Sequence, residues 1–206
     1  MKENEESRLQ RLWEKESSLQ ESGYAMIAGI DEVGRGPLAG PVVAACVVLP
    51  PKTYLPGLND SKKVAPALRY KLAELIKEHA VTWGIGLVGH EEIDRINILQ
   101  ATKKAMVEAV NNTSQRPDYL LIDALRIPAP ILQEAVIHGD SLCASIASAS
   151  IMAKTYRDDL MIAMDDLYPQ YGFKENKGYG TPRHLEALRI YGPCPIHRIS
   201  FLRFMV

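Results

Sequence analysis

The sequence contains only three cysteines, and none of them belongs to a Cys-x-x-Cys pair. An odd number of widely spaced cysteines argues against a disulfide framework and against a zinc site. Long apolar runs are also missing, since the longest extends from Val42 to Leu49, far below the roughly 18 residues of a membrane-spanning helix. The acidic N-terminus has none of the apolar character of a secretory signal. We therefore expect a cytoplasmic protein with no membrane association.

The sequence has no excess of charge of either sign. Its 24 Lys and Arg residues nearly balance 25 Asp and Glu residues, for a formal net charge of -1, whereas nucleic-acid-binding domains are commonly strongly basic. The total conceals a gradient, because residues 1–22 contain four basic and six acidic residues while residues 170–206 contain six basic and two acidic residues. A nucleic-acid partner is therefore not excluded, and we expect its affinity to depend only moderately on salt.

The 206 residues suffice for one large α/β domain, and 47% hydrophobic and 24% charged residues are close to globular averages. Short apolar runs predict strands at 24–31, 42–49, 81–88, 118–123 and 135–138. Helical patterns cover 66–79, 91–110 with a candidate break near Asn97, 141–167, and a segment that starts at Thr181. This order predicts one mixed sheet covered by helices.

Three regions are expected along the chain. Residues 1–22 have Leu9, Leu12, Trp13 and Leu19 at helical spacing, which predicts an amphipathic helix that packs on the body. Residues 23–167 contain the predicted sheet and its helices. Residues 168–206 contain a loop rich in Gly, Lys and Tyr, a helix and an aromatic tail, and are expected to form a helical appendage.

Four acidic residues stand at the ends of apolar runs: Asp31, Glu32, Asp123 and Asp140. A single acid in such a place is more often a turn residue or a helix cap, but three strand ends of one sheet can meet at one edge, where sites of α/β sheets gather. Clustered carboxylates raise each other's pKa and need cations to stay ionised. An oxygen-only ligand set suits Mg²⁺ or Mn²⁺, and two such ions suit in-line displacement at phosphorus.

Asp31 and Glu32 are neighbours, and neighbouring side chains of a regular strand point to opposite faces of the sheet. We therefore expect the strand to end or to bend at this pair, which the backbone freedom of Gly34 and Gly36 would permit.

The segment from Gly34 to Ala39 also fits the dinucleotide pattern G-x-G-x-x-G/A. That pattern requires the glycines to open a helix, whereas Pro37, Pro41 and the β-branched residues that follow predict a turn and a strand. The segment is therefore interpreted as a glycine turn beside the acidic pair, with Arg35 contacting a phosphate or a carboxylate.

Basic residues gather in two places. Lys62 and Lys63 follow Asn59-Asp60-Ser61, and a solvated surface explains this pair as well as a binding site does. In the C-terminal loop, Tyr179 lies between two glycines close to Lys177 and Arg183. An exposed aromatic ring in a basic loop is suited to stacking on a sugar or a base. The pair His197-Arg198 fits either a core contact or a phosphate contact.

The ordered motifs resemble those of bacterial ribonuclease HII. The resemblance covers nearly everything from residue 24 onward. It rests on residues 30–41 (IDEVGRGPLAGP), 58–63 (LNDSKK), Asp123, 138–141 (HGDS), 145–147 (SIA), 153–154 (AK), 177–181 (KGYGT) and 197–198 (HR). Ribonuclease HIII is the nearest alternative, but its glycine turn has Lys where this sequence has Arg35, and it carries an N-terminal domain that these residues do not include.

The resemblance implies a ribonuclease H-like fold, in which helices flank a mixed five-stranded sheet and a C-terminal helical appendage follows. It also implies an endonuclease that cleaves the RNA strand of RNA–DNA hybrids. Such an enzyme also cuts on the 5′ side of ribonucleotides embedded in duplex DNA, leaving 3′-hydroxyl and 5′-phosphate ends. By position, Asp31, Glu32, Asp123 and Asp140 would hold two Mg²⁺ or Mn²⁺ ions.

The same resemblance implies roles for the substrate-binding residues. Gly34, Arg35 and Gly36 would read the 2′-hydroxyl through their backbone, and Tyr179 would pack on the sugar at the RNA–DNA junction. The remaining candidates for substrate contact are Lys62, Lys177 and Arg183. We expect a monomer. The tail 199–206 is expected to pack on the body rather than to dock on a sliding clamp.

Two other functions stay open from the sequence. The first is a non-catalytic nucleic-acid-binding module of the same fold, although concentrated negative charge would not help such a protein to bind phosphates. The second is a metal-dependent phosphatase acting on small molecules, which would not need the basic, aromatic loop at 171–180.

Overall fold

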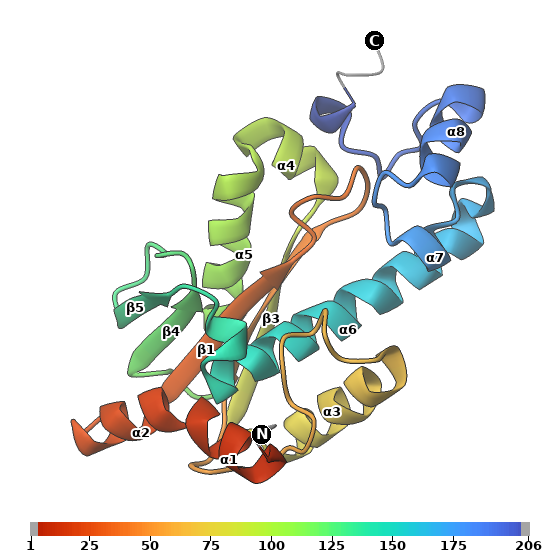
Figure 1. Ribbon diagram of the computed structural model, residues 1–206. Helices are drawn as coiled ribbons and strands as arrows, with labels where there is room; N and C mark the ends of the chain where they lie inside the picture. The colour runs from red at the N-terminus through yellow and green to blue at the C-terminus, as the bar shows by residue number, and fades with distance from the viewer. Residues whose placement is uncertain (1–3, 203–206) are drawn as a thin grey trace.

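The computed structural model describes residues 4–202, in which five strands form a mixed sheet with helices on both faces (Figure 1). The strand order is β3-β2-β1-β4-β5. Strand β1 (Ile27–Val33) pairs antiparallel with β2 (Val42–Val48) and parallel with β4 (Tyr119–Asp123). At the edges, β3 (Thr82–Val88) is antiparallel to β2, and β5 (Leu132–Val136) is parallel to β4. The predicted mixed five-stranded sheet is confirmed.

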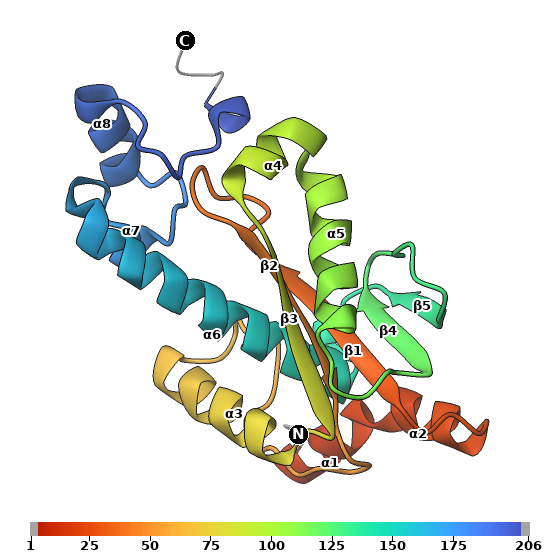
Figure 2. The same cartoon turned by 180° about the vertical axis from the view of Figure 1, so that it is seen from behind.

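Helices cover both faces of the sheet, and all seven residues of β2 are buried. Alternate side chains of β2 point to opposite faces. Val43, Ala45 and Val47 face the core formed with α3 and α6, whereas Val42, Ala44 and Cys46 face the core formed with α5. Figure 2 shows α5 and α6 on either side of the sheet. The helices are α1 (Glu5–Leu12), α2 (Glu14–Glu21), α3 (Pro66–His79), α4 (His90–Ile96), α5 (Ile98–Asn111), α6 (Ala144–Leu167), α7 (Phe173–Asn176) and α8 (Pro182–Tyr191). Across residues 4–202, none of these helices has the length and apolarity needed to cross a membrane.

The first turns of α6 lie directly against β1, and small side chains make this approach possible. A Cβ atom on Gly29 would lie 2.0 Å from the backbone carbon of Ser145, so no larger residue fits at this point of β1. The contact fixes α6 over the strand that carries Asp31 and Glu32. From there, α6 continues toward the C-terminal segment.

The N-terminal helix and strand β5 differ from the sequence prediction, whereas the predicted helix break agrees with it. The N-terminal helix is two helices, because the backbone tightens at the buried Trp13, whose N–H donates to the Gln10 carbonyl; residues 1–3 lie outside the described part. Strand β5 occupies 132–136 instead of 135–138, because His138 has a left-handed backbone with φ 58°. The break at Asn97 is present, and the Asn97 side chain caps α5.

Glu16 of α2 caps the N-terminus of α6, which has no side-chain cap of its own. Its Oε1 accepts hydrogen bonds from the Ser145 N–H and hydroxyl at 2.9 and 2.7 Å, and its side chain is buried. We expect Glu16→Ala to lower the free energy of unfolding by about 2 kcal/mol, the upper end for a lost cap. Denaturant unfolding measures this loss. The exposed Glu14→Ala serves as the control, with an expected change below about 0.5 kcal/mol, and an equal effect of both substitutions would contradict the capping role.

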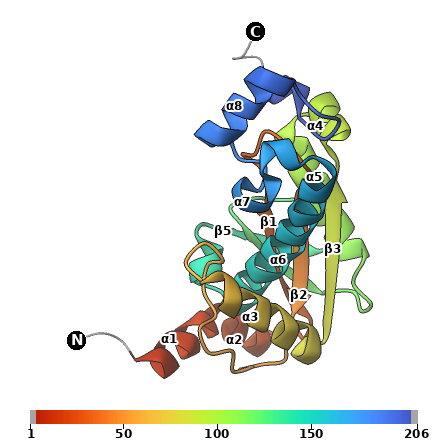
Figure 3. The same ribbon diagram turned by 90° about the vertical axis from the view of Figure 1, so that its right-hand side faces the viewer.

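The C-terminal segment covers the glycine loop 34–41 at the end of the molecule opposite α1 and α2 (Figure 3). Leu38 and Ala39 of the loop share a core with Tyr171, Phe173 and Leu188. The tail packs back on the body as far as it is described, since Leu202 is buried and the N–H of Ile199 donates to Asp94 at 2.8 Å. Residues 203–206, the rest of the tail that is expected to pack on the body, lie outside the described part, and the boundary at 168 stays a prediction.

Candidate active site

Asp31 and Glu32 lie inside β1, which continues to Val33, so the strand does not end at this pair; the other alternative, a bend there, stays a prediction. Asp31 is 6% exposed, and its Oδ1 accepts the Glu32 N–H at 2.7 Å. Ser150 of α6 lies close enough to the Asp31 carboxyl group to lower its pKa, against the stronger effect of burial. Both acids still line one cavity, because they lie at the end of the strand where the glycine turn leaves the sheet open.

Burial raises the pKa of Asp31 well above its usual value, and the nearby carboxylates of Glu32 and Asp123 raise it further. The pKa of Glu32 is also raised by burial, although the Arg35 guanidinium opposes this shift. Arg35 donates to Glu32 Oε1 at 3.3 Å, so it braces a carboxylate, one of the two roles expected for it. Glu32 Oε2 is buried and has no hydrogen-bond partner, so one carboxylate oxygen is left for a ligand.

Asp123 is the last residue of β4, and Asp140 lies in the turn that follows β5. The N–H of Gly139 donates to Asp123 Oδ1 at 2.8 Å, and this bond ties the Asp140 turn to the end of β4. Burial raises the pKa of Asp140, and the carboxylates of Asp60 and Asp123 add to the shift. Because the Asp123 carboxylate also adds to the raised pKa of Asp31 and Glu32, the four predicted acids belong to one electrostatic cluster.

The cavity has a volume of about 370 Å³ and combines acidic, basic and aromatic groups. It is lined by Asp31, Glu32, Val33, Gly34, Arg35, Gly36, Ser61, Lys62, Ser150, Lys154 and Tyr179. A Cβ atom on Gly36 would lie 3.6 Å from the Tyr179 ring, so the ring lies beside the glycine turn. The structure thus brings together the predicted glycine turn, Lys62 and Tyr179.

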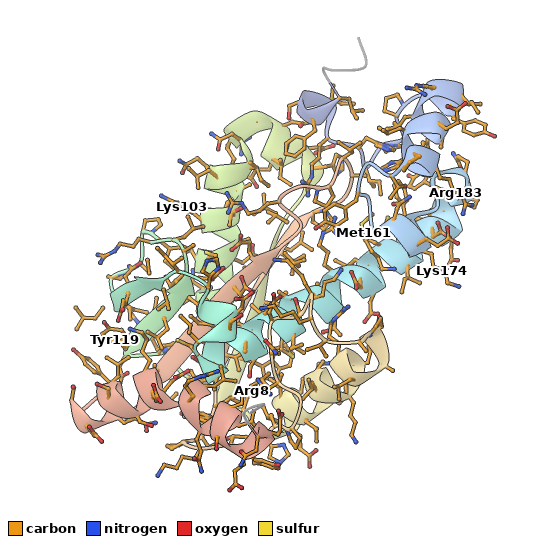
Figure 4. The ribbon with its side chains drawn as sticks, in the orientation of Figure 1. Arg8, Lys103, Tyr119, Met161, Lys174 and Arg183 are labelled. Carbon is orange, nitrogen blue, oxygen red and sulfur yellow. The ribbon has the colours of Figure 1, made fainter. Side chains whose placement is uncertain are left out.

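Two predicted substrate-binding side chains do not line this cavity. Lys177 turns its ammonium group back to the Lys174 carbonyl, and Arg183 forms an ion pair with Glu175. Figure 4 shows Arg183 and Lys174 close together beside α7 and α8, away from β1. A contact of Lys177 or Arg183 with a longer substrate duplex stays a prediction.

Several residues of the cavity and of the acidic cluster were not assigned a role from the sequence, among them Ser150, Lys154 and Asp60. Ser150 and Lys154 line the cavity from α6, and Asp60 lies close enough to Asp140 to raise the pKa of that carboxyl group. Lys154 also donates to Asp158 at 2.6 Å. The spacing of Ser150, Lys154 and Arg157 on one face of a helix that is otherwise rich in small residues is a signal that could have identified this face.

The donor set fits a hard divalent cation. The four acids offer oxygen ligands only, the Asp123 carboxylate adds to the raised pKa of Asp31, Glu32 and Asp140, and one buried Glu32 oxygen is unpartnered; positive charge would relieve these conditions. In residues 4–202, no three His, Cys, Asp or Glu side chains already converge closely enough to enclose an ion. Binding would therefore require rotation of carboxylate side chains.

Asp31→Asn should raise the Tm of the protein in EDTA at neutral pH. A carboxyl group whose folded-state pKa is raised contributes stability below its unfolded pKa and loses it as the pH rises through the folded value, so an ionised Asp31 destabilises the metal-free fold. We expect a gain of about 2–4 °C, the shift that about 1 kcal/mol produces at this size. Calorimetry at pH 4 and pH 7.5 measures it.

The gain should be much smaller at the lower pH, where Asp31 stays protonated in the folded wild-type protein and the pH is close to the ordinary pKa of an unfolded aspartate. The exposed Asp166→Asn is the matched control and should leave the Tm unchanged at both pH values. A Tm gain that is largest at pH 4 would contradict the electrostatic origin of the effect.

The fold and the acidic cavity define a ribonuclease H-like protein. The structure resembles that of the ribonuclease H2 from Pyrococcus horikoshii OT3 with a TM-score of 0.71 and 27% sequence identity, over 85% of this chain and 93% of that one. The family model for ribonuclease HII matches residues 28–204. The chain therefore belongs to the ribonuclease HII family and has the ribonuclease H activity class of that family.

Curated relatives agree with this assignment. The chain is 53% identical to ribonuclease HII of Caldanaerobacter subterraneus subsp. tengcongensis, over 97% of this chain and 83% of that protein. It is 57% identical to ribonuclease HII of Desulfitobacterium hafniense strain DSM 10664, over 96% of this chain and 76% of that protein. These identities decide between the two families that the motifs suggested.

Proposed function

We propose that this chain is an endonuclease that cleaves the RNA strand of RNA–DNA hybrids and cuts on the 5′ side of ribonucleotides embedded in duplex DNA. The observation that carries the proposal is the cavity itself. In it, Asp31 and Glu32 lie beside a glycine turn and the ring of Tyr179, and one Glu32 carboxylate oxygen has no hydrogen-bond partner. Carboxylates alone would repel a phosphodiester, whereas carboxylates with bound cations would hold one.

Asp31, Glu32, Asp123 and Asp140 are proposed to hold two divalent cations, Mg²⁺ or Mn²⁺. Such ions supply charge that stabilises the phosphoryl transition state, and they lower the pKa of a bound water molecule. Bst-RNase HIII, a structural neighbour with 18% identity and a TM-score of 0.59, has been solved in complex with Mn²⁺. In this chain, the Gly139 N–H would keep the Asp123 carboxylate oriented, and Arg35 would do so for Glu32.

Selectivity for a ribonucleotide is proposed to come from the glycine turn and from Tyr179. Only the 2′-hydroxyl group distinguishes one ribonucleotide from its deoxy neighbours, so a reader of hydrogen bonds has to lie beside the reacting phosphate. Within residues 4–202, the N–H groups of Arg35 and Gly36 donate to no protein acceptor. They are therefore available to a sugar hydroxyl, while the Tyr179 ring would pack against the same sugar.

The test is cleavage of a labelled DNA duplex that contains one ribonucleotide, with the all-DNA duplex as the matched control. Incubation with Mg²⁺ or Mn²⁺ should give a single cut 5′ to the ribonucleotide, with 3′-hydroxyl and 5′-phosphate ends, and EDTA should abolish it. The all-DNA duplex should stay intact. Metal-independent cutting, or no cutting with either ion, would refute the proposal and would favour a binding module.

A further inference from the structure

Two arginines are completely buried near the glycine turn, and neither forms an ion pair within the described chain. Arg157 of α6 and Arg198 of the C-terminal segment are both 0% exposed. Burying a guanidinium without a carboxylate is unfavourable unless its N–H groups are fully hydrogen-bonded. The position of both charges therefore needs a reason, and their hydrogen bonds provide it.

Every hydrogen bond of the Arg198 guanidinium goes to a backbone carbonyl of the loop 34–41. Nη2 donates to Gly34 at 2.7 Å, Nη1 to Arg35 at 3.1 Å and to Pro37 at 2.8 Å, and Nε to Gly40 at 2.9 Å. The backbone N–H of Arg198 adds a bond to the Leu38 carbonyl at 2.8 Å. One residue from the far end of the chain thus binds five carbonyl groups of a single loop.

Arg157 joins the same loop to the segment that carries Tyr179. Its guanidinium donates to the carbonyls of Pro41 at 2.9 Å, of Ala39 at 3.1 Å and of Lys177 at 2.9 Å. A Cβ atom on Gly34 would lie only 2.2 Å from the Arg157 Nε, and Gly34 has a φ of 91°. Only glycine satisfies both conditions, so the turn is built around this guanidinium.

The direction of these carbonyls determines the direction of the N–H groups in the turn. A trans peptide unit is planar, with its C=O and N–H antiparallel, and the described chain has no cis peptide bonds. Arg198 draws the Gly34 and Arg35 carbonyls inward, so the N–H groups of Arg35 and Gly36, which belong to the same two peptide units, point the opposite way. These are the two N–H groups that no protein acceptor uses.

We infer that Arg198 is a positioning residue, which holds the N–H groups of Arg35 and Gly36 toward the cavity so that they can recognise a ribose 2′-hydroxyl. This inference rests on the proposed function. The arginine guanidinium suits this role because its five N–H donors can bind several carbonyl groups at once. A lysine ammonium, with three donors on a flexible side chain, cannot replace it. Arg157 connects the turn to the Tyr179 segment and so keeps the two sugar contacts in register.

The first experiment tests the clamp without substrate. In protein labelled with ¹⁵N-glycine, Arg198→Lys should shift or broaden the Gly36 amide resonance, because the peptide unit is no longer held on its carbonyl side. Met106→Ala, which opens a cavity in the core on the α5 side of the sheet, is the control for lost stability and should leave that resonance in place. An unchanged Gly36 resonance in folded Arg198→Lys overturns the inference.

The second experiment measures the affinity for a DNA duplex with one ribonucleotide and for the all-DNA duplex, in an Asp123→Asn background that prevents turnover. Arg198→Lys should reduce the preference for the ribonucleotide by about tenfold, the size expected for two weakened hydrogen bonds. Affinity for the all-DNA duplex should change less than about twofold, because phosphate contacts remain. Met106→Ala should keep the preference.

Loss of affinity for both duplexes by the same factor indicates a general structural role and overturns the inference. An undiminished preference in folded Arg198→Lys also overturns it, while the proposed function stands. If the background protein itself shows no preference, recognition of the 2′-hydroxyl by this turn fails, and the role of Arg198 fails with it.

Discussion

Asp123→Asn should reduce turnover on an RNA–DNA hybrid at least about a thousandfold, which corresponds to about 4 kcal/mol of lost transition-state stabilisation. The amide removes one negative charge from a cluster in which Asp123 raises the pKa of both Asp31 and Asp140. Fewer ligand charges mean weaker cation binding at the reacting phosphate. Repulsion of the substrate also falls, so affinity for the hybrid should be maintained or increased.

Single-turnover cleavage and equilibrium binding of the same labelled hybrid separate these two effects. Asp118→Asn is the matched control, because Asp118 immediately precedes β4, at the end opposite Asp123. Asp118 accepts the N–H groups of Ala25 and Met26 at 2.9 and 3.0 Å and lines no part of the cavity. Its substitution should change stability but not turnover per folded molecule.

The metal dependence of the loss distinguishes a ligand from a structural aspartate. Raising the Mn²⁺ concentration should recover part of the activity of Asp123→Asn, because weaker cation binding is what the substitution causes. Near-normal turnover at low Mn²⁺ would remove Asp123 from the proposed cation site. Loss of hybrid binding in parallel with turnover would place the defect in folding or in substrate contact.

The sequence pattern was sufficient to predict the sheet and the position of its acids, because both depend on local hydrophobicity. The apolar run before Asp123 becomes the buried strand β4, and the acid falls at its end. The expectation that β1 ends at Asp31 and Glu32 differs from the structure. Alternation along a strand does separate the two side chains, but a cavity at the end of the sheet is open to both, so β1 does not need to end between them.

The role of the buried arginines was beyond the reach of sequence reasoning. Arginine is usually exposed, and His197-Arg198 fitted a core contact as well as a phosphate contact. The structure decides for the core, since His197 and Arg198 are 1% and 0% exposed. The Arg198 partners lie more than 150 positions earlier in the chain, and no local periodicity encodes such a contact. For Lys62, the lysine pair in the sequence fits a solvated surface as well as a binding site. The structure places Lys62 in the cavity wall.

The position of Tyr179 depends on two buried histidines of the C-terminal segment. Its carbonyl oxygen is bonded to Nδ1 of His184 at 2.8 Å, and Nε2 of His184 lies 2.9 Å from Nε2 of His197. The Cys194 N–H donates to Nδ1 of His197 at 2.9 Å, so His197 carries its proton on Nε2 and His184 carries its proton on Nδ1. Burial lowers the pKa of His197 to about 4, which keeps this arrangement neutral and intact at physiological pH.

Because this histidine pair anchors the backbone, the Tyr179 ring can be removed without releasing the loop. Tyr179 is 42% exposed, and its ring lies beside Gly36. Tyr179→Ala should therefore lower kcat/KM at a single embedded ribonucleotide by about 5- to 150-fold, the range that corresponds to the loss of one aromatic stacking contact of about 1–3 kcal/mol. Steady-state cleavage of the duplex with one ribonucleotide measures this effect.

Two matched variants separate the ring from its hydroxyl group and from its position in the chain. Tyr179→Phe keeps the stacking face and should retain most of the activity. Tyr191→Ala removes a more exposed tyrosine of α8, which lies outside the cavity, and should have no effect. Since the histidine pair and the Arg157 bond to Lys177 stay in place in all three variants, an unchanged rate in Tyr179→Ala would show that the ring makes no productive contact with the sugar. A defect of equal size in Tyr179→Phe would transfer the role from the ring to the hydroxyl group.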